Sequence, residues 1–212
     1  LPDGRTIPYR ASFSGGQKTG WFYDQAANRG ALARYVVPGA RVLDVCSYAG
    51  AWAISALKSG AAAATCVDAS QGALDQAQVN ARLNGVGITT RRGDAFVELA
   101  ALADAGERYD LVVIDPPAFI KRRKEFPQGV AAYRKLNQLA MRLIDRDGIL
   151  VSCSCSWHLG SEDLLGAIQG AARHVDRFVQ LLQAGGQAPD HPIHPAIPET
   201  RYLKTFFCRV TR

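Results

Sequence analysis

The chain has 212 residues and a formal net charge of +6; 48% of its residues are hydrophobic and 21% are charged. This composition is typical of a globular domain with a substantial core, and it excludes an intrinsically disordered or fibrous protein. The excess of positive charge favours an anionic partner, of which nucleic acid is the commonest large one.

Cysteine usage indicates the compartment. Five cysteines stand at irregular spacing, an odd number, and this predicts reduced thiols in a cytoplasmic protein. The sequence has no charged-then-apolar leader and no uninterrupted apolar run of membrane length, so we expect no membrane partner. It begins at Leu1-Pro2-Asp3-Gly4 without an initiator methionine, which leads us to expect a fragment of a longer protein.

The first 30 residues are expected to form a hairpin and lid region ahead of a catalytic domain over residues 31–212. Polar and apolar residues alternate over residues 1–20 between glycine turns, which predicts an antiparallel β-hairpin. The aromatic run at 21–23 then either continues the hairpin as a strand that buries Trp21 and Tyr23, or forms a lid that offers Gln25 and Arg29 to a ligand carboxylate.

From residue 41 onward, short β-branched segments alternate with segments of helical Ala and Leu spacing, which predicts βαβ units and a parallel sheet. We expect seven strands, over residues 41–45, 64–67, 88–91, 111–114, 149–152, 178–182 and 202–210. We expect helices over residues 51–58, 72–83, 95–103, 131–144 and 162–174. The pattern fits one doubly wound α/β domain, and the long loop over residues 184–200 is expected to be functional.

Four successive strands end in an aspartate: Asp44, Asp68, Asp94 and Asp115. Ligands bind at the carboxyl ends of strands in open α/β sheets. One such aspartate is as well explained as a helix N-cap, but four in register favour a ligand with ribose hydroxyls, an amino-bearing base and a cationic tail. S-adenosyl-L-methionine is such a ligand. Adenine nucleotides also fit, although no Walker-type lysine follows the glycine turn.

The turn after the first strand, Ser47-Tyr48-Ala49-Gly50, leads into a helix. It offers backbone N–H groups and the positive end of the helix dipole to an anionic group. The three spaced glycines of the dinucleotide fingerprint are absent, which argues against a nicotinamide cofactor.

Two strands would deliver a thiol and an acid to one edge of the sheet. The apolar segment from Leu150 runs into Cys155, and another ends at Asp115-Pro116-Pro117, where the prolines force an extended exit. The alternative for Cys155 is a buried structural thiol, or a redox or metal pair with Cys153. Because no other Cys or His run has ligand spacing, we predict no metal site.

These stretches resemble the bacterial large-subunit ribosomal RNA cytosine-C5 methyltransferases of the class I S-adenosylmethionine-dependent superfamily. The matching residues are Gln17-Lys18-Thr19-Gly20, Asp24-Gln25, Ser47-Tyr48 with Gly50, Val67-Asp68 with Ala73-Leu74-Asp75, Asp115-Pro116-Pro117-Ala118-Phe119, Ser154-Cys155-Ser156, and His194-Pro195 through Tyr202-Leu203-Lys204. The resemblance implies a Rossmann-like fold with an antiparallel last strand. Relatives usually carry a PUA domain ahead of the hairpin, of which this sequence shows no sign.

The resemblance also implies an activity, the formation of 5-methylcytosine in large-subunit (23S) ribosomal RNA through a covalent cysteine adduct. Cys155 would add to C6 of the cytosine, and Asp115 would hold or protonate the ring at N3 and N4. A free thiol has a pKa of about 8.5, so the site must lower the pKa of Cys155. His158 and Lys121 are candidates for that role.

Together, the strand ends and the resemblance predict the residues that bind S-adenosyl-L-methionine: Gln25, Asp44, Ser47, Tyr48, Gly50, Asp68, Asp94, Asp115 and Pro116. Three positions depart from the family pattern. Ala49 and Ala51 flank Gly50 where relatives have Thr and a second Gly, and Ala26 stands where they have Arg. These departures concern the fine geometry of cofactor binding.

Lys121, Arg122 and Arg123, followed by Lys124, come directly after the Asp-Pro-Pro turn. They would contact RNA phosphates at the rim of the site, or else form a solvated loop. The target cytosine must be unstacked to reach Cys155, so a loop or single strand of ribosomal RNA is the expected partner. The sequence leaves the oligomeric state open, a homodimer included.

Three other functions compete with this one. An RNA methyltransferase acting on a guanine or adenine nitrogen would need the Asp-Pro-Pro turn but no thiol. A non-catalytic RNA-binding or cofactor-sensing module is conceivable because of Ala26, Ala49 and Ala51. A thiol redox protein is the most distant alternative, because two cysteines one residue apart lack an activating motif.

Overall fold

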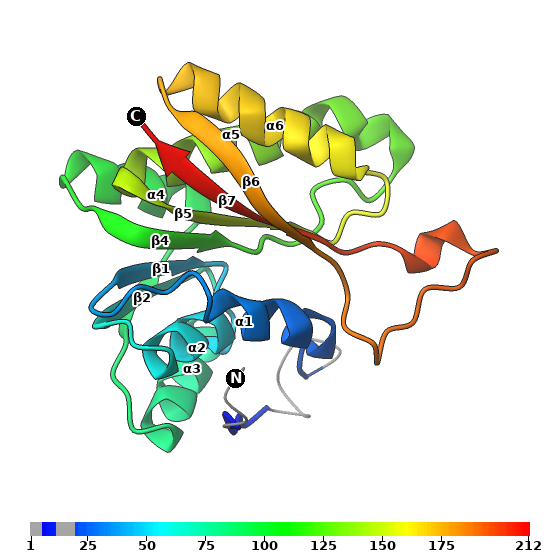
Figure 1. Cartoon of the computed structure of the whole chain (residues 1–212). Helices are drawn as coiled ribbons and strands as arrows, with labels where there is room; N and C mark the ends of the chain where they lie inside the picture. The colour runs from blue at the N-terminus through cyan, green and yellow to red at the C-terminus, as the bar shows by residue number, and fades with distance from the viewer. Residues whose placement is uncertain (1–5, 12–19) are drawn as a thin grey trace.

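A seven-stranded sheet forms the centre of the protein in the computed structural model, which describes residues 6–11 and 20–212 (Figure 1). The strand order is β3-β2-β1-β4-β5-β7-β6, and all neighbouring pairs are parallel except those made by β7. The strands are β1 (Arg41–Val45), β2 (Ala63–Asp68), β3 (Thr89–Arg92), β4 (Tyr109–Ile114), β5 (Ile144–Ser154), β6 (Phe178–Gly185) and β7 (Lys204–Thr211). The expected mostly parallel sheet with an antiparallel last strand is confirmed.

Helices cover both faces of this sheet. The α-helices are α1 (Ala26–Leu32), α2 (Ala51–Lys58), α3 (Gln71–Leu83), α4 (Ala95–Asp104), α5 (Phe126–Leu143) and α6 (Ser161–His174), and the short 3₁₀ turns are η1 (Tyr23–Gln25), η2 (Arg123–Glu125) and η3 (Pro198–Thr200). Helices α1 to α3 lie below the sheet in Figure 1 and α4 to α6 above it. The molecule is therefore a doubly wound, Rossmann-like domain, as predicted.

Each face of the sheet buries its own hydrophobic core. In β1, Val42 packs toward α1 and α2, while Leu43 and Val45 pack toward the opposite face. Successive side chains of a strand point to opposite faces, and a central parallel strand is covered on both sides. This explains why the central strands appear in the sequence as continuous apolar runs.

Two elements begin five residues earlier than the sequence predicts. Helix α5 begins at Phe126 rather than at residue 131, and Pro127 in its first turn suits that position because proline has no N–H to leave unpaired. Strand β5 begins at Ile144 rather than at residue 149. Its pairing with β4 is interrupted by a bulge, which takes up residues 145–148 between the predicted helix and the predicted strand.

The region ahead of β1 is where the prediction was wrong. Residues 6–11 do not pair as a strand but lie along α2 and α3, where Asn80 accepts a bond from Arg10 N (2.7 Å) and Asn84 Nδ2 donates to Pro8 O (2.8 Å). The remaining part of the expected hairpin, residues 12–19, lies outside the described residues. Residues 21–23 do not form the hairpin strand, one of the two alternatives for this run, because η1 begins at Tyr23; the expected boundary after residue 30 falls inside α1.

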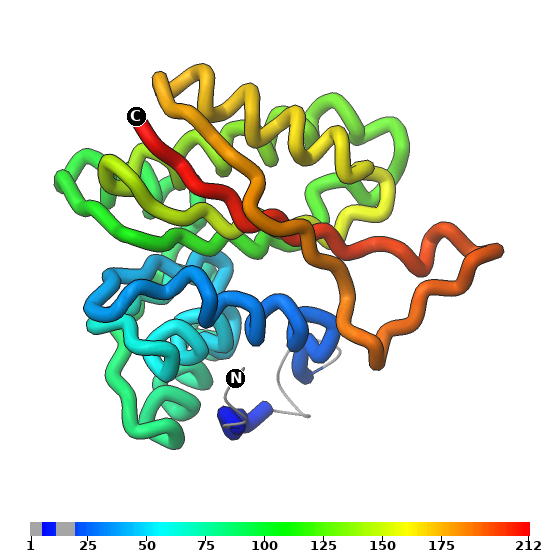
Figure 2. The backbone as a smooth tube through the Cα atoms, in the orientation of Figure 1, coloured from blue at the N-terminus to red at the C-terminus, as the bar shows by residue number. Residues whose placement is uncertain are grey.

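The long loop between β6 and β7, residues 186–203, contacts η1 and α1 near its two ends and projects away from the sheet between them (Figure 2). Ala188 N donates to Asp24 O (2.8 Å), and Tyr202 Oη donates to Asp24 Oδ2 (2.8 Å). The loop therefore closes one side of the edge at which the parallel strands end. Within the described part of the chain, no helix is long and apolar enough to cross a membrane.

Candidate active site

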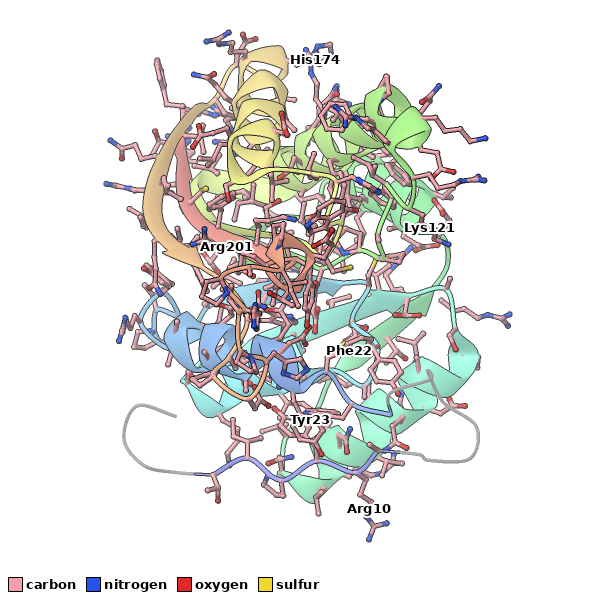
Figure 3. All side chains as sticks on the ribbon, turned by 90° about the vertical axis from the view of Figure 1, so that its right-hand side faces the viewer. Arg10, Phe22, Tyr23, Lys121, His174 and Arg201 are labelled. Atoms are coloured by element: carbon pink, nitrogen blue, oxygen red, sulfur yellow. The ribbon has the colours of Figure 1, made fainter. Side chains whose placement is uncertain are left out.

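The carboxyl ends of the parallel strands form one edge of the sheet, which faces the viewer in Figure 3. Asp115 lies at its centre, directly after β4. Its carboxylate accepts hydrogen bonds from Trp52 Nε1 (3.0 Å) and from Gln25 Nε2 (3.1 Å and 3.2 Å to the two oxygens). Burial raises the pKa of Asp115 to about 6, against the lowering effect of the Trp52 bond. Both protonation states of this acid are therefore accessible near neutral pH.

Gln25 is held in place by a buried polar network. Its Oε1 accepts a bond from Asn28 Nδ2 (2.7 Å), which fixes the amide so that the NH₂ group points at Asp115. Asn28 also bonds Thr205 Oγ1 of β7 (3.1 Å) and Gly186 O of the long loop (2.8 Å). Sequence reasoning found Gln25 but missed Asn28. The missed signal is the helical spacing of the buried residues of α1, at 25, 28, 29 and 32.

Cys155 follows the last residue of β5 and is half-buried. Burial raises the pKa of its thiol, and the carboxylate of Asp115 raises it further. Lys204 is the positively charged group that acts in the opposite direction. The sequence had pointed to His158 and Lys121 for this role.

Lys204 comes from the buried start of β7, and its side chain reaches the loop that carries Cys155. Its ammonium group donates to Ser156 O (2.6 Å) and Tyr202 O (2.7 Å), and burial lowers its pKa to about 8. Below that pH it carries a positive charge. A lysine inside an otherwise apolar strand was the available sequence signal, because lysine is almost never fully buried without a partner.

A cluster of three buried hydroxyls fixes the Cys155 loop from beneath. Tyr133 of α5 lies 2.9 Å from both Ser154 Oγ and Ser156 Oγ, and Ser156 Oγ also accepts a bond from Ile120 N (3.2 Å). Ile120 belongs to the segment after the Asp-Pro-Pro turn. The cluster therefore couples the two loops that carry the acid and the thiol.

The turn after β1 has an unusual backbone. Cys46, Tyr48 and Gly50 have positive φ angles of 59°, 46° and 76°. A Cβ atom on Gly50 would lie only 2.9 Å from Ala77 Cβ, so this position needs glycine both for its φ angle and for space. Ser47 is buried in the same turn, and its N–H donates to Val67 O (3.1 Å).

Asp44 is the most unusual carboxylate of this edge. It is fully buried; Oδ2 accepts a bond from Ala53 N (3.0 Å), but Oδ1 has no hydrogen-bond partner in the described part of the chain. Asp24 Oδ1 is a second buried oxygen of this kind. Burial raises the pKa of Asp44 to about 8. Buried polar atoms are nearly always paired, so these two oxygens, with Ser47 Oγ in the turn after β1, are candidate contacts for a ligand.

The next two strand ends are more conventional. Asp68 accepts bonds from Tyr48 N (2.9 Å) and Ser70 N (2.9 Å) and so holds the first turn in place. Asp94 caps α4 by accepting bonds from the N–H groups of residues 96 and 97 (2.9 Å and 3.3 Å), as the N-cap interpretation expected. Pro116 is buried beside Asp115.

The rim of the edge carries basic and aromatic side chains. Lys121, Arg122 and Arg123 are exposed, and Arg122 pairs with Glu125 (2.6 Å). Trp157 is 41% exposed two residues after Cys155, with its ring against His158 at 4.7 Å between centroids. Lys121 lies on this rim in Figure 3, on the side away from Arg201. The site thus has a buried acidic centre and a basic, partly aromatic border.

Comparison with known proteins agrees with this geometry. The profile of the family described as S-adenosylmethionine-dependent methyltransferase matches residues 4–203. The chain is 40% identical over 199 residues to Ribosomal RNA large subunit methyltransferase I of Klebsiella pneumoniae and 38% identical over 198 residues to that of Erwinia tasmaniensis, in each case covering 92% of this chain and 50% of the relative. The chain thus spans about half the length of the curated relatives it matches.

Solved structures with the same fold include SMU.776, described as a methyltransferase, in complex with SAH. It aligns with a TM-score of 0.78 at 21% identity and covers 89% of this chain and 50% of that one. Trm5b of Pyrococcus abyssi aligns with a TM-score of 0.64 at 16% identity, over 91% of this chain and 50% of that one. At these identities the likeness establishes the fold.

Proposed function

This chain belongs to the S-adenosylmethionine-dependent methyltransferase family, and we propose that it methylates C5 of a cytosine in large-subunit ribosomal RNA through a covalent adduct with Cys155. The observation that carries the proposal is the pairing of a thiol at the end of β5 with a hydrogen-bonded carboxylate at the end of β4, on one edge of the sheet. The curated relatives, which act on large-subunit ribosomal RNA by name, support the substrate class.

The residues at the ends of β1 to β3 suit S-adenosyl-L-methionine. The unpaired oxygens of Asp44 and Asp24 are available to a ligand, and the turn at Gly50 lets the backbone approach it closely. Asp68 and Asp94 would face the ribose and the base. When bound, this cofactor supplies an electrophilic methyl group on a sulfonium.

Cys155 would act as the nucleophile. Its thiolate adds to C6 of the cytosine, the electrons of the C5–C6 double bond move toward N3, and C5 becomes nucleophilic enough to accept a methyl group. Loss of the C5 proton then expels the thiolate and restores the ring. Asp115, with its pKa raised to about 6, would hold or protonate N3 as the adduct forms.

Lys204 would be a positioning residue. Its ammonium group supports the carbonyl of Ser156 and stabilises negative charge on Cys155. It offsets part of the effect of burial and of Asp115, both of which favour the neutral thiol. The negative charge of Asp115 therefore disfavours the thiolate form of Cys155, and the positive charge of Lys204 offsets part of this effect.

RNA would approach over the rim. The cytosine must leave its stack to reach Cys155, and an exposed aromatic ring beside the site offers a surface on which a neighbouring base can stack. Trp157 has the required exposure and position. Lys121 and Arg123 would contact phosphates on the other side of the opening.

Nucleoside mass spectrometry tests the proposal. Unmodified large-subunit RNA is incubated with S-adenosyl-L-methionine and the native chain, Cys155→Ala or Cys153→Ala. Cys153 is the control thiol, because it is fully buried in β5 two residues before Cys155, where it accepts a bond from Thr205 Oγ1. We expect 5-methylcytidine from the native chain and Cys153→Ala, and a loss of about 1,000-fold or more in Cys155→Ala.

Other outcomes would decide between the rival functions. A methylated guanosine or adenosine, formed equally well by Cys155→Ala, would establish a nitrogen methyltransferase. Failure of the native chain to bind S-adenosyl-L-methionine in calorimetry, together with no methylated product, would contradict any catalytic role for this chain on its own.

A further inference from the structure

A second concave site lies at the opposite edge of the sheet, where β4 and β5 begin and β7 ends. It has a volume of about 390 Å³. Five arginines line it and are called the arginine pocket here: Arg108, Arg142, Arg146, Arg177 and Arg212. They come from four separate regions of the chain, the start of β4, the α5–β5 junction, the α6–β6 junction and the end of β7. Only two aspartates share the lining, so positive charge is in excess.

Arg177 forms the floor of the pocket. Its guanidinium donates to the main-chain carbonyls of Asp145 (2.7 Å), Arg146 (3.3 Å) and Met141 (3.4 Å), and to that of Ile144. These bonds satisfy carbonyls at the end of α5, where a helix has no partners of its own. Arg177 is therefore a structural residue, and its position is fixed.

The other arginines surround this fixed charge without being neutralised. Burial lowers the pKa of Arg177, the positive charges of Arg212 and Arg108 lower it further, and the negative charge of Asp145 acts in the opposite direction. Within residues 6–11 and 20–212, none of the five guanidinium groups lies within ion-pair distance of a carboxylate. The side chains of Arg142 and Arg146 are exposed. A fold that gathers like charges without pairing them retains a repulsion that a bound anion would relieve.

We propose that the arginine pocket binds phosphate groups of the RNA backbone, remote from the reacting base. The inference rests on the proposed function, since it takes RNA as the substrate. Strand β4 has six residues, so the pocket and Asp115 are separated by roughly 20 Å at about 3.3 Å per residue. About a dozen phosphates lie along that length of a double helix, at about 1.7 Å of axis per charge. One stem-loop can therefore reach both edges of the sheet.

Phosphates held in this pocket would position the RNA and contribute affinity without reading its sequence. Arginine suits this role because its planar fork bonds phosphate oxygens in pairs. A small polyphosphate is the alternative occupant. The observations favour RNA because the arginines lie around an open depression rather than in an enclosed cavity shaped for a small ligand.

The test measures how RNA affinity depends on salt. A fluorescently labelled stem-loop from large-subunit RNA is titrated with the native chain, with R142Q/R146Q and with R34Q/R82Q between 50 and 300 mM KCl (about a sixfold range). Arg34 and Arg82 are exposed arginines at the end of α1 and in α3, far along the chain from the pocket, so the control removes the same charge. Each lost phosphate contact reduces the slope of log K against log salt by about 1.

We expect the slope to fall by about 2 in R142Q/R146Q, with affinity about tenfold weaker at 100 mM KCl, and by less than half as much in the control. R142K/R146K, which keeps the charge, should retain most of the slope. Equal slopes in the pocket variant and the control would overturn the proposal. So would calorimetric binding of inorganic pyrophosphate to the native chain together with an unchanged RNA slope, because the pocket would then take small polyphosphates.

Two safeguards keep the result interpretable. Among residues 6–11 and 20–212, the side chains of Arg142 and Arg146 have no hydrogen-bond or ion-pair partner to lose, so the variants should fold, and Arg108→Gln provides a second, independent change in the same pocket. Formation of 5-methylcytidine is measured on the same RNA. If the native chain methylates the RNA but the pocket variants leave the salt slope unchanged, only this inference is rejected. If the pocket variants reduce the slope but the native chain forms no 5-methylcytidine, only the proposed function is rejected.

Discussion

The two halves of the carboxyl edge are built in different ways. At the ends of β2 and β3, each carboxylate accepts a bond from a main-chain N–H group only two residues further along the chain, Asp68 from Ser70 and Asp94 from Phe96, and Asp68 also accepts one from Tyr48 N. At the ends of β4 and β5 and the start of β7, the polar groups are held by side chains from remote elements. Asp115 bonds Trp52 and Gln25, 63 and 90 residues away. One half is local capping chemistry, and the other exists only when the whole domain is assembled.

The halves also differ in how their charges are satisfied. Both oxygens of Asp115 accept hydrogen bonds, and its pKa rises only to about 6; Asp44 keeps one unpaired oxygen in a fully buried position, and its pKa rises to about 8. The number of donors therefore decides how much of the cost of burial is offset. An unpaired, buried carboxylate oxygen lowers the stability of the folded protein. A ligand that donates a hydrogen bond to this oxygen would offset part of that cost.

Removing the central acid should produce the largest change. Asp115→Asn replaces one acceptor oxygen by a donor facing Trp52 and Gln25, and it removes the group that would protonate the cytosine ring. We expect single-turnover methylation to fall by about 100- to 10,000-fold. In the native chain, the rate should fall as the pH rises through about 6 and Asp115 loses its proton. In Asp115→Asn this fall should be absent.

The matched control for this change is Asp110→Asn on the same strand. Asp110 lies at the other end of β4, where it accepts a bond from Arg41 N (2.7 Å) that an asparagine oxygen can also accept. It should leave the rate within about threefold of the native value, the usual range for a change away from the reacting atoms. Equal losses in both variants would show that the effect on β4 is structural.

An intermediate effect is expected from the lysine beside the thiol. Lys204→Met removes the positive charge that lowers the pKa of Cys155, so that pKa should rise and the alkylation of Cys155 by iodoacetamide should slow about tenfold at pH 7.5. Because Lys204 itself loses its proton near pH 8, the difference between native and variant should shrink at higher pH. Peptide mass spectrometry measures alkylation at this one cysteine.

Two further variants separate charge from hydrogen bonding. Lys204→Gln can still donate to the carbonyl of Ser156 but carries no charge, so it should resemble Lys204→Met if charge is what matters. Lys135→Met, on the exposed surface of α5, is the control for loss of one lysine. An unchanged pH profile of alkylation in Lys204→Met would mean that this residue only supports the loop.

The smallest effect on activity, with an opposite effect on stability, is expected at Asp44. Asp44→Asn should weaken S-adenosyl-L-methionine binding about tenfold in calorimetry, since the amide cannot ionise to pair with the cationic ligand as the carboxyl group can. The folded pKa is raised, so the native carboxylate costs stability progressively as pH rises from about 4 to about 8. The variant avoids that cost and should be more stable by about 1–3 kcal/mol at pH 9, with little difference at pH 5.

Denaturant unfolding at the two pH values measures this difference. Asp94→Asn is the control, because it alters an exposed helix cap and should show no gain that grows with pH. A stability gain of Asp44→Asn that is equal at pH 5 and pH 9 would contradict the assignment of the cost to the buried charge.

The sequence by itself determined the framework and the local half of the site. Strand and helix periods, the aspartates that follow the strands and Cys155 on its strand depend on neighbouring residues, and the structure places them at one edge as expected. Helix α1 was missed because its buried face is polar, Gln25 and Asn28 included, and polar periodicity does not distinguish a helix from a lid.

Tertiary structure decided the rest. The bond from Trp52 to Asp115, the hydroxyl cluster at Tyr133, the position of Lys204 and the arginine pocket all join residues that lie tens of positions apart. Such contacts arise because helices and strands remote in the chain are packed against one sheet. The local sequence pattern does not show which residues this packing brings together. Helix capping and the alternation of side chains along a strand, by contrast, depend only on the backbone within a few residues.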